Sequence, residues 1–363
     1  MSWNRRSEER QRQIAAGGVA VRWAHNSSVY FLKSLILKGL LARLSTMTRK
    51  TEDRINELKL LRSGSSEAAD SPLTKALGDK SNLVVAEAAK IIGELQRSNL
   101  IHDLLVNFSR LFEDPVKSDP KCWGKTAIIK ALIALDHDES GPFLRAATHV
   151  QMEPVYGGQE DSAIHLRANA VLALVQCTDL TRSEILRHVV DALVDPSDTV
   201  RIEAVRTLEQ MNGEESAVLL RLKSHLGDKR SSVVGQVFDS LLALERERGI
   251  EFVSRFMKSS DPETRDEAAL ALGASRSPKA VEKLTDAWKD CRSREFGSVL
   301  LRALSSSRDE TALEFLLGLV REGAGKDSAA ALEALAIHSD SPEMRERTEK
   351  AKRERKTSSW EPK

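Results

Sequence analysis

The chain has 363 residues, of which 41% are hydrophobic, 4% are aromatic and 30% are charged, with a formal net charge of +1. This length allows two or three compact domains, while the near-zero charge provides no global excess that would favour nucleic acid or an anionic membrane. Only three cysteines occur, far apart and without a CxxC pair, which argues against a disulfide framework or a thiolate zinc site and favours a reducing, cytoplasmic location.

The first 50 residues differ from the rest in charge. Residues 1–51 contain ten Lys or Arg and only two acidic residues, a net charge of +8, so the remainder is mildly acidic. Residues 29–41 are apolar but include Lys33 and Lys38, and they are too short to span a bilayer, which takes roughly 20 helical residues. Three interpretations stay open: disordered sequence or sequence upstream of a natural start at Met47, an organelle-targeting or membrane-surface helix, and a folded cap. We predict no transmembrane segment.

From about residue 65 onward, a turn containing Asp, Ser or Pro is followed repeatedly by a helix with a small, apolar inner face. The clearest copies are residues 195–205 (DPSDTVRIEAV) and 261–270 (DPETRDEAAL). The equivalent small positions are Ala88, Ala127, Ala170, Ala204, Val237, Ala268, Val299 and Ala331. Their successive spacings of 39, 43, 34, 33, 31, 31 and 32 residues predict stacked helical repeats.

One unit shows the pattern within each repeat. Residues 184–193 are predicted as a first helix, which Asp195-Pro196 ends because proline disfavours a helical conformation in the residue before it. Asp198 is predicted as the N-cap of the second helix, and Asn212-Gly213 as its left-handed end. The same order predicts further helices at residues 217–226, 228–244, 250–257, 261–273, 280–288, 294–304, 312–320 and 326–337. No alternating β pattern of useful length occurs.

The repeating units resemble HEAT repeats, particularly the short class found in phycobilisome-lyase-like proteins. The resemblance rests on the Asp-Pro turns at Asp195 and Asp261 and on the small-residue helices that follow them, and it covers roughly residues 65–340. It implies an all-α fold, a right-handed α-solenoid of about eight HEAT-like helical pairs over residues 51–340, between a basic segment (1–50) and a charged tail (341–363). It also implies that Asp161/Arg167, Asp195/Arg201 and Asp261/Arg265 form a polar ladder between repeats. Members of this family act mostly as scaffolds and adaptors.

The two long spacings indicate insertions, which in a solenoid surface as loops on one face. The first is residues 113–121, followed by Cys122-Trp123, and the second is residues 149–161. The second insertion concentrates polar and aromatic side chains, namely His149, Gln151, Glu153, Tyr156 and Asp161, and it contains Gly157-Gly158. Two interpretations are open: the loop binds a ligand, or it fills a groove between repeats and sets their curvature.

Chemical motifs are weak. Gly124-Lys125-Thr126 resembles the end of a phosphate-binding loop, but that loop needs a glycine where Asp119 stands. His149, Glu153, Asp161 and His165 form a possible metal set without a fixed ligand spacing. Cys122 is a possible nucleophile, but nothing in the sequence places it beside a histidine. We predict no metal site and no cofactor.

Nucleic-acid binding is an alternative, because DNA-alkylation-repeat glycosylases also stack HEAT-like helices. The inner helices carry a few basic residues, but acidic residues interrupt them, whereas tracking of phosphates needs clustered cations. A lyase-type or metal-dependent HEAT-like enzyme is a further alternative. We favour a non-catalytic cytoplasmic scaffold that binds a protein or peptide along its concave face and the 149–161 loop. The predicted anchors are Trp123, Tyr156 and Arg167, since aromatic and Arg side chains provide large contact area and bidentate pairing.

Overall fold

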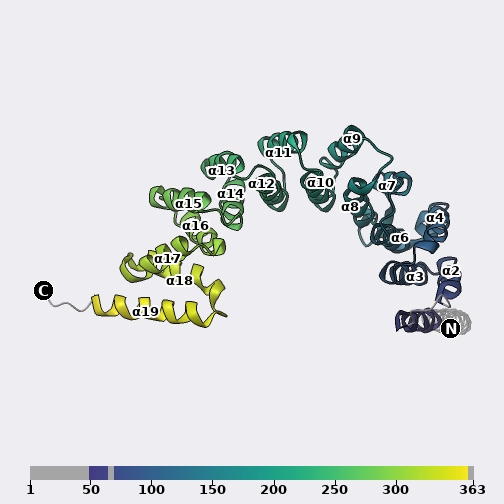
Figure 1. Ribbon diagram of the computed structural model, residues 1–363, viewed down its shortest axis with the longest axis horizontal. Coiled ribbons are helices and arrows are strands. Elements are labelled where there is room, and N and C mark those ends of the chain that lie inside the picture. The colour runs from purple at the N-terminus through teal and green to yellow at the C-terminus, as the bar shows by residue number, and fades with distance from the viewer. Residues whose placement is uncertain (1–48, 64–68, 359–363) are drawn as a thin grey trace, which may run out of the picture.

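The computed structural model describes residues 49–63 and 69–358 (Figure 1). The predictions for the basic segment therefore fall almost wholly outside the described residues. The described chain is a row of antiparallel helices bent into an arch, with its two ends at opposite feet of the arch.

After a helix over residues 49–60 and a short η1 (Leu61–Ser63), the described residues form eight consecutive pairs of an outer and an inner helix, as predicted. The pairs are α2 (Asp70–Leu77) with α3 (Asn82–Glu94), α4 (Ile101–Arg110) with α6 (Trp123–Ala134), α7 (Gly141–Ala147) with α8 (Ile164–Ala173), α9 (Arg182–Ala192) with α10 (Asp198–Met211), α11 (Glu214–Leu226) with α12 (Ser231–Glu245), α13 (Glu247–Val253) with α14 (Pro262–Ala274), α15 (Pro278–Asp290) with α16 (Arg294–Ser307), and α17 (Glu310–Glu322) with α18 (Gly325–Leu335).

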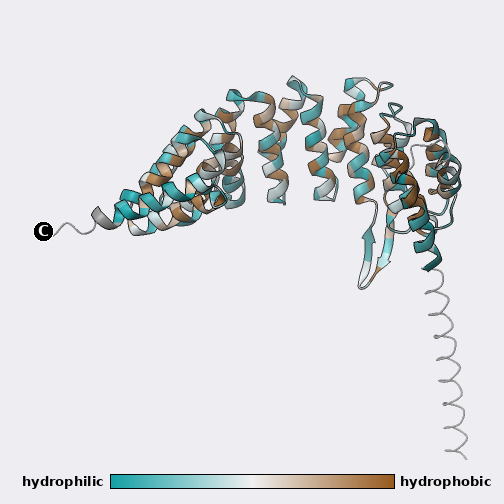
Figure 2. Ribbon diagram, turned by 60° about the horizontal axis from the view of Figure 1, so that its bottom comes forward, coloured by the Kyte–Doolittle hydropathy of each residue, from teal (hydrophilic) through white to brown (hydrophobic). Residues whose placement is uncertain are grey.

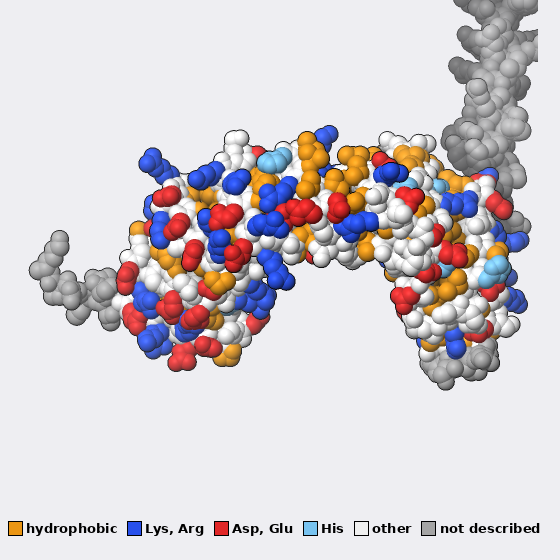
Figure 3. Space-filling view, turned by 45° about the horizontal axis from the view of Figure 1, so that its top comes forward, with side chains coloured by type: hydrophobic (Ala, Val, Ile, Leu, Met, Phe, Trp, Pro, Cys, Tyr) orange, Lys and Arg blue, Asp and Glu red, His pale blue; other side chains and the backbone are white. Residues whose placement is uncertain are grey.

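Short elements join these helices. They are η3 (Ser98–Leu100), α5 (Pro115–Ser118), η4 (Pro120–Cys122), η5 (Leu174–Gln176), η6 (Ser254–Lys258) and η7 (Ala336–His338). Each inner helix contacts the next inner helix along the chain, from α3 to α18, so the inner row lines the concave face of the arch (Figure 1). Hydrophobic residues of both rows face one another, which gives one core that runs the length of the arch (Figure 2). Charged residues of both signs are mixed over the outer face (Figure 3).

The small residues at the repeated position explain the close packing of the inner row. Seven of the eight predicted positions are buried on inner helices; the exception is Ala127, which is half-buried, with Ile128 beside it fully buried. Glycines allow an even closer approach at two contacts between neighbouring inner helices, α3 with α6 and α14 with α16. A Cβ at Gly93 would lie 3.2 Å from the Cα of Ala131, and one at Gly273 would lie 2.8 Å from the carbonyl carbon of Ala303. Larger side chains would separate neighbouring repeats.

The predicted polar ladder is present at two of its three positions. Arg167 of α8 pairs with Asp195 through two hydrogen bonds of 2.9 and 3.2 Å, and Arg201 of α10 pairs with Asp228 at 2.9 and 2.7 Å. Each pair joins an inner helix to the turn of the next repeat. The prediction for Asp261 and Arg265 is wrong: Asp261 caps its own helix by accepting from the backbone N–H of Thr264, and Arg265 does not reach it.

The second insertion is a β-hairpin, which the sequence did not reveal. Strand β1 (Met152–Val155) pairs antiparallel with β2 (Gly158–Asp161), with Met152 opposite Asp161 and Val155 opposite Gly158. Gly157 in the turn has a φ of +90°, which other residues rarely adopt. The hairpin extends away from the arch as a narrow projection between α7 and α8 (Figure 2). The fold is otherwise helical throughout the described ranges.

The charged sequence after residue 341 continues into helix α19 (Pro342–Ser358), which packs on α17. Met344 and Ala351 of α19 are buried, and Arg347 pairs with Glu310 and Glu314 of α17. Among the helices that the structure describes, none combines the length and the apolar composition needed to cross a membrane.

Candidate binding groove on the concave face

The start of α6 directs Trp123 toward the concave face. Asp119 accepts hydrogen bonds from the backbone N–H groups of Gly124 and Lys125, at 2.7 and 2.9 Å, and so satisfies the first turn of the helix. A Cβ at Gly124 would lie 2.9 Å from Cδ1 of Leu111 and 3.1 Å from Oδ1 of Asp119, so a larger residue would have to displace these side chains. The residues that resemble a phosphate-binding loop in sequence are thus a buried helix start.

Lys125 is buried in the same place and makes no contact with solvent. Its ammonium group lies 3.2 Å from Asp119 and 3.2 Å from the carbonyl oxygen of Leu111. A buried lysine is tolerated only when it is paired and hydrogen-bonded, as here. The pair fixes the first turn of α6, and Trp123, immediately before Gly124, remains 49% exposed.

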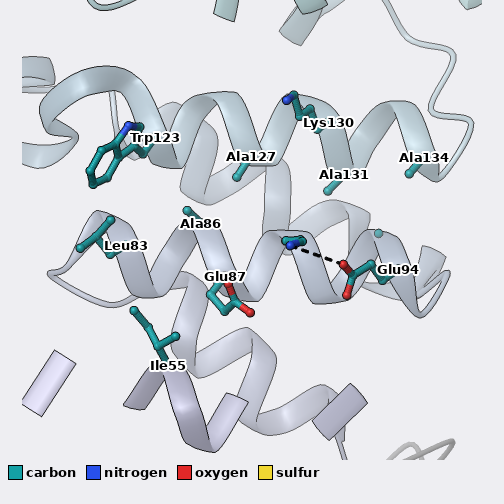
Figure 4. A pocket seen from close by; sticks show the side chains of 12 residues that line it. Ile55, Leu83, Ala86, Glu87, Glu94, Trp123, Ala127, Lys130, Ala131 and Ala134 are labelled. Atoms are coloured by element: carbon teal, nitrogen blue, oxygen red, sulfur yellow. Dashed lines mark ion pairs between the residues drawn. The ribbon is translucent and has the colours of Figure 1, made fainter. Parts of the chain in front are cut away.

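Trp123 stands at one end of a cavity of about 640 Å³ between α3, α6 and the helix over residues 49–60 (Figure 4). Small side chains form its floor, namely Ala86, Ala127, Ala131 and Ala134, together with Gly93. Ile55 and Leu83 add larger apolar surface (Figure 4). The cavity is therefore an open, mostly apolar furrow along two inner helices.

A second cavity, of about 420 Å³, adjoins the first and shares Trp123, Ala127 and Lys130 with it. It continues across α6 to Ser162 and His165, at the start of α8. We call the two cavities together the concave groove. It follows the inner surface of three successive repeats, in the part of the chain that holds both insertions.

Charges at the rim of the concave groove are unevenly balanced. Glu87 and Glu94 pair with Arg62 at 2.9 and 2.8 Å, and Lys90 lies 3.8 Å from Glu94 (Figure 4). Lys130 is exposed and has no ion-pair partner among the described residues. Lys121, which lines the second cavity, is likewise exposed and without an ion-pair partner in the described ranges, so the groove offers apolar surface beside two cations and suits an apolar segment with acidic residues.

Three of the predicted binding residues hold the hairpin in place. Gln151 is buried and donates to the carbonyl oxygen of Asp119 at 2.9 Å and to Glu153 at 2.7 Å, while its side-chain oxygen lies 3.2 Å from Nε2 of His149. Glu153 also accepts from the backbone N–H of Lys121 at 2.6 Å. These contacts tie the base of the hairpin to the start of α6, so the side chains serve the protein's own structure.

The ionisation of these residues reflects the same contacts. Burial lowers the pKa of His149, which packs edge-on against Phe112 with ring centroids 4.8 Å apart. Burial opposes ionisation of Asp161, but hydrogen bonds from the backbone of Ala163 and Gln151 and from Arg167 outweigh it and lower the pKa of that carboxyl. His149 is therefore neutral and Asp161 ionised at neutral pH. Among the described residues, no three His, Cys, Asp or Glu side chains are grouped to hold a metal ion.

The remaining predicted residues have different environments. Arg167 is buried, and its guanidinium is hydrogen-bonded to Asp161, Asp195 and the carbonyl oxygen of His149. It is therefore not free to contact a partner, although the sequence analysis predicts it as an anchor. Tyr156 is fully exposed at the tip of the hairpin. Burial raises the pKa of the Cys122 thiol to about 11, so this residue is protonated at neutral pH. Of the seven predicted binding residues, only Trp123 lines the concave groove.

Sequence reasoning missed most of the groove residues. Leu83, Ala86 and Lys90 recur at helical spacing on α3, as do Ala127, Ala131 and Ala134 on α6. An exposed leucine beside a row of alanines is the signal that would have marked this surface. It is easily mistaken for core, since small apolar residues also face the neighbouring repeat.

Residues 222–298 and 251–336 each match the family HEAT repeats. Similar solved structures include human deoxyhypusine hydroxylase in complex with glycerol, with 20% identity over 69% of this chain and 88% of that chain and a TM-score of 0.28. Two engineered proteins are also similar: one has 16% identity over 83% of this chain and 88% of its own, with a TM-score of 0.33, and the other 18% over 74% and 95%, with 0.20. No curated protein matches the chain significantly in sequence.

At these identities and scores we draw nothing about activity from the three structures. The matched repeats begin in α11 and end in η7, and the paired helices before them continue the same row. The family model therefore identifies HEAT repeats in residues 222–336, within a longer row of paired helices.

Proposed function

We propose that this protein is a non-catalytic scaffold that binds an apolar helix or extended segment of a partner protein in the concave groove. The observation that supports the proposal is an exposed Trp123 beside Ala86, Ala127 and Ala134, which the described side chains leave at least partly exposed. Exposed apolar surface of this kind usually marks an interaction site.

The dimensions and chemistry of the groove favour a peptide. Alanines on α3 and α6 allow the backbone of a bound helix to approach closely, and tryptophan is among the residues that contribute most to interfaces. Lys130 would pair with an acidic residue of the partner. Tyr156, on the hairpin beside the second cavity, supplies a further contact for a segment that extends past α8.

The proposal is tested by site-specific photo-crosslinking. Benzoylphenylalanine in place of Leu83, which lines the groove and is 38% exposed, should yield one dominant cross-linked protein from the full chain in its native host. Benzoylphenylalanine at Val218 of α11, which is 55% exposed on the outer row, is the matched control and should not capture that protein.

Two variants then test the groove itself. Trp123→Ala should weaken the purified complex by roughly 10- to 100-fold, since an interface tryptophan contributes about 2 kcal/mol or more, and Ala127→Arg should abolish it by filling the floor. An unchanged affinity in both variants would refute the proposal. Retention of the protein on single-stranded DNA at low salt, lost on changing Lys130, would favour the nucleic-acid alternative instead.

A further inference from the structure

The polar ladder has a regular geometry in the middle of the arch. Arg167 and Arg201 are each the fourth residue of their inner helix, and each pairs with an aspartate two residues before the N-cap of the next inner helix. These aspartates, Asp195 and Asp228, also accept from the backbone N–H of the N-cap residues Ser197 and Arg230. The aspartate therefore both shapes the turn and neutralises the arginine.

Arg265 occupies the arginine position of α14, but the aspartate position is taken by a cysteine. Arg265 is the fourth residue of α14, and Cys291 lies two residues before Ser293, the N-cap of α16. The side chain of Cys291 lacks the two oxygens with which a carboxylate pairs with a guanidinium, and it donates instead to the carbonyl oxygen of Ser293 at 3.2 Å. The carboxylate that completes the other pairs is missing here.

No other side chain replaces that carboxylate with comparable geometry. The nearest is Asp266, the adjacent residue, whose Oδ1 lies 3.4 Å from both Nε and a terminal nitrogen of Arg265. The guanidinium otherwise stacks over the ring of Phe296, 4.3 Å from its centroid. That stacking holds the guanidinium in a fixed plane, and the two long contacts with a single oxygen of Asp266 do not form the bidentate pair that a closer oxyanion would make.

Arg265 also lines a cavity of about 770 Å³ between η6, α15 and the turn before α16. Three further cations line this cavity and are exposed: Arg255, Lys258 and Arg292. None of the three has an ion-pair or hydrogen-bond partner within residues 49–63 and 69–358. We call this cavity the Arg265 pocket.

Acidic groups around the Arg265 pocket do not cancel these cations. Glu251 is occupied by Lys279 and Lys283, and Asp286 pairs with Lys289. Asp290 is the third carboxylate of the lining, so it offsets one of the four arginine and lysine charges, and Ser254, Ser259 and Ser293 complete the polar surface. Several unpaired cations around one fixed guanidinium form a surface that attracts a compact anion.

We propose that the Arg265 pocket binds an oxyanion, a phosphate or carboxylate group carried by a peptide, which completes the ladder position that Cys291 leaves open. Arg265 makes the bidentate contact, and Arg255, Lys258 and Arg292 provide the surrounding positive charge. The site is separate from the concave groove, which lies on α3, α6 and α8, so either proposal can fail alone.

The binding test uses calorimetric titration of the full chain. The probes are inorganic phosphate and a capped Ala-Ala-phosphoserine-Ala-Ala peptide, with the glutamate and unmodified serine peptides for comparison. We expect the phosphoserine peptide to bind at least as tightly as free phosphate and to compete with it, the glutamate peptide to bind more weakly, and the serine peptide not to bind. Binding of free phosphate but not of the peptides would overturn the assignment to a peptide, as would tighter binding of a short oligonucleotide.

Variants at the two ladder positions locate the site. Arg265→Gln should weaken binding of both phosphate probes by about 10- to 100-fold, which corresponds to the loss of charge-assisted hydrogen bonds. Cys291→Asp should weaken it to a similar degree by supplying the missing carboxylate within the chain, whereas the neutral Cys291→Asn should change it by less than about twofold.

Two control variants separate this site from the rest of the surface. Arg187→Gln removes the charge of an exposed arginine on α9, and Trp123→Ala alters the concave groove. Both variants should bind phosphate as tightly as the wild-type protein. Wild-type affinity in Cys291→Asp, with Arg265→Gln also unaffected, would overturn the proposal.

Discussion

The first three helix pairs and the five that follow them share the same core pattern but differ in the length of the segments that connect their helices. From α9 to α18 the repeats follow one another at 31–33 residues, and their turns are short. From α3 to α8 the spacing rises to 39 and 43, and the extra residues form the start of α6 and the hairpin. The concave groove lies in the irregular part. Insertions thus create a specific surface without interrupting the core, because each repeat contacts only its neighbours.

Arg167 is where the two parts are joined, and its loss should have the largest effect on stability. It contacts Asp161 and the His149 carbonyl on the hairpin side and Asp195 in the next repeat. Arg167→Met should destabilise the protein by about 3–4 kcal/mol, since it leaves largely buried carboxylates without their partner. Urea unfolding followed by circular dichroism measures this. An effect below 1 kcal/mol would show that the two parts are joined mainly by apolar packing.

A steric substitution tests the regular part alone. Gly273→Val places new atoms against the backbone of Ala303 and should cost roughly 2–3 kcal/mol through overpacking of α14 on α16. Gly318→Ala in α17 is the matched control, because a Cβ there meets nothing within 4 Å. It should stabilise the protein by about 0.4–1 kcal/mol. Equal effects of the two changes would contradict the packing described for the inner row.

Acid titration tests the regular ladder. Burial disfavours the charge on Asp228, but its hydrogen bonds with Arg201 and Lys223 prevail and lower its pKa to about 2. The folded-state pKa lies below the unfolded value, so the stabilisation is present above about pH 4 and is lost as the pH falls through about 2. It should amount to about 2 kcal/mol. Asp228→Asn should remove this part of the acid dependence of the free energy of unfolding, and an unchanged pH profile would contradict it.

The smallest expected effect concerns the concave face of the regular part. Desolvation, together with the nearby Glu209, raises the pKa of Asp239 to about 6, although the residue is exposed. The folded-state pKa is above the unfolded value, so stability contributed by the neutral form declines as the pH rises from about 4 to 6. Asp239→Asn should therefore stabilise the protein at pH 7 by a few tenths of a kcal/mol, after solvent screening. A lower melting temperature at pH 7 would contradict this.

The regular part could be predicted from sequence almost helix by helix. The predicted helix at 261–273 is α14 (Pro262–Ala274), and the one at 217–226 is α11 (Glu214–Leu226), because repetition identifies each element several times over. Errors there are small: the N-cap of α10 is Ser197 and not Asp198. Helix α10 does end at Asn212-Gly213, where φ is positive as predicted (56° and 88°), but the ψ values of −175° and 172° are extended and not those of a left-handed helical cap.

The irregular part could not be predicted in the same way. The hairpin strands have four residues each and are exposed on both faces, so they carry no hydrophobic alternation. The repeat pattern predicts Ala127 as a buried small residue, but Ala127 lies half-exposed in the groove. The changed repeat spacing just before it makes the pattern less exact at this position. Arg167 was recognised both as a ladder residue and as a partner contact, and only its burial decides between them.

Helix α19 has a consequence for how copies of this protein behave in solution. It covers the apolar side of α17, and its arginines occupy Glu310, Glu314 and the carbonyl oxygens of Val320 and Gly323. A stack of repeats is open-ended by nature, so any uncovered terminal repeat is a template onto which another copy can add. Because α19 shields this side of α17 with charged side chains, we expect that surface to pair less readily with a second copy than an uncovered repeat would.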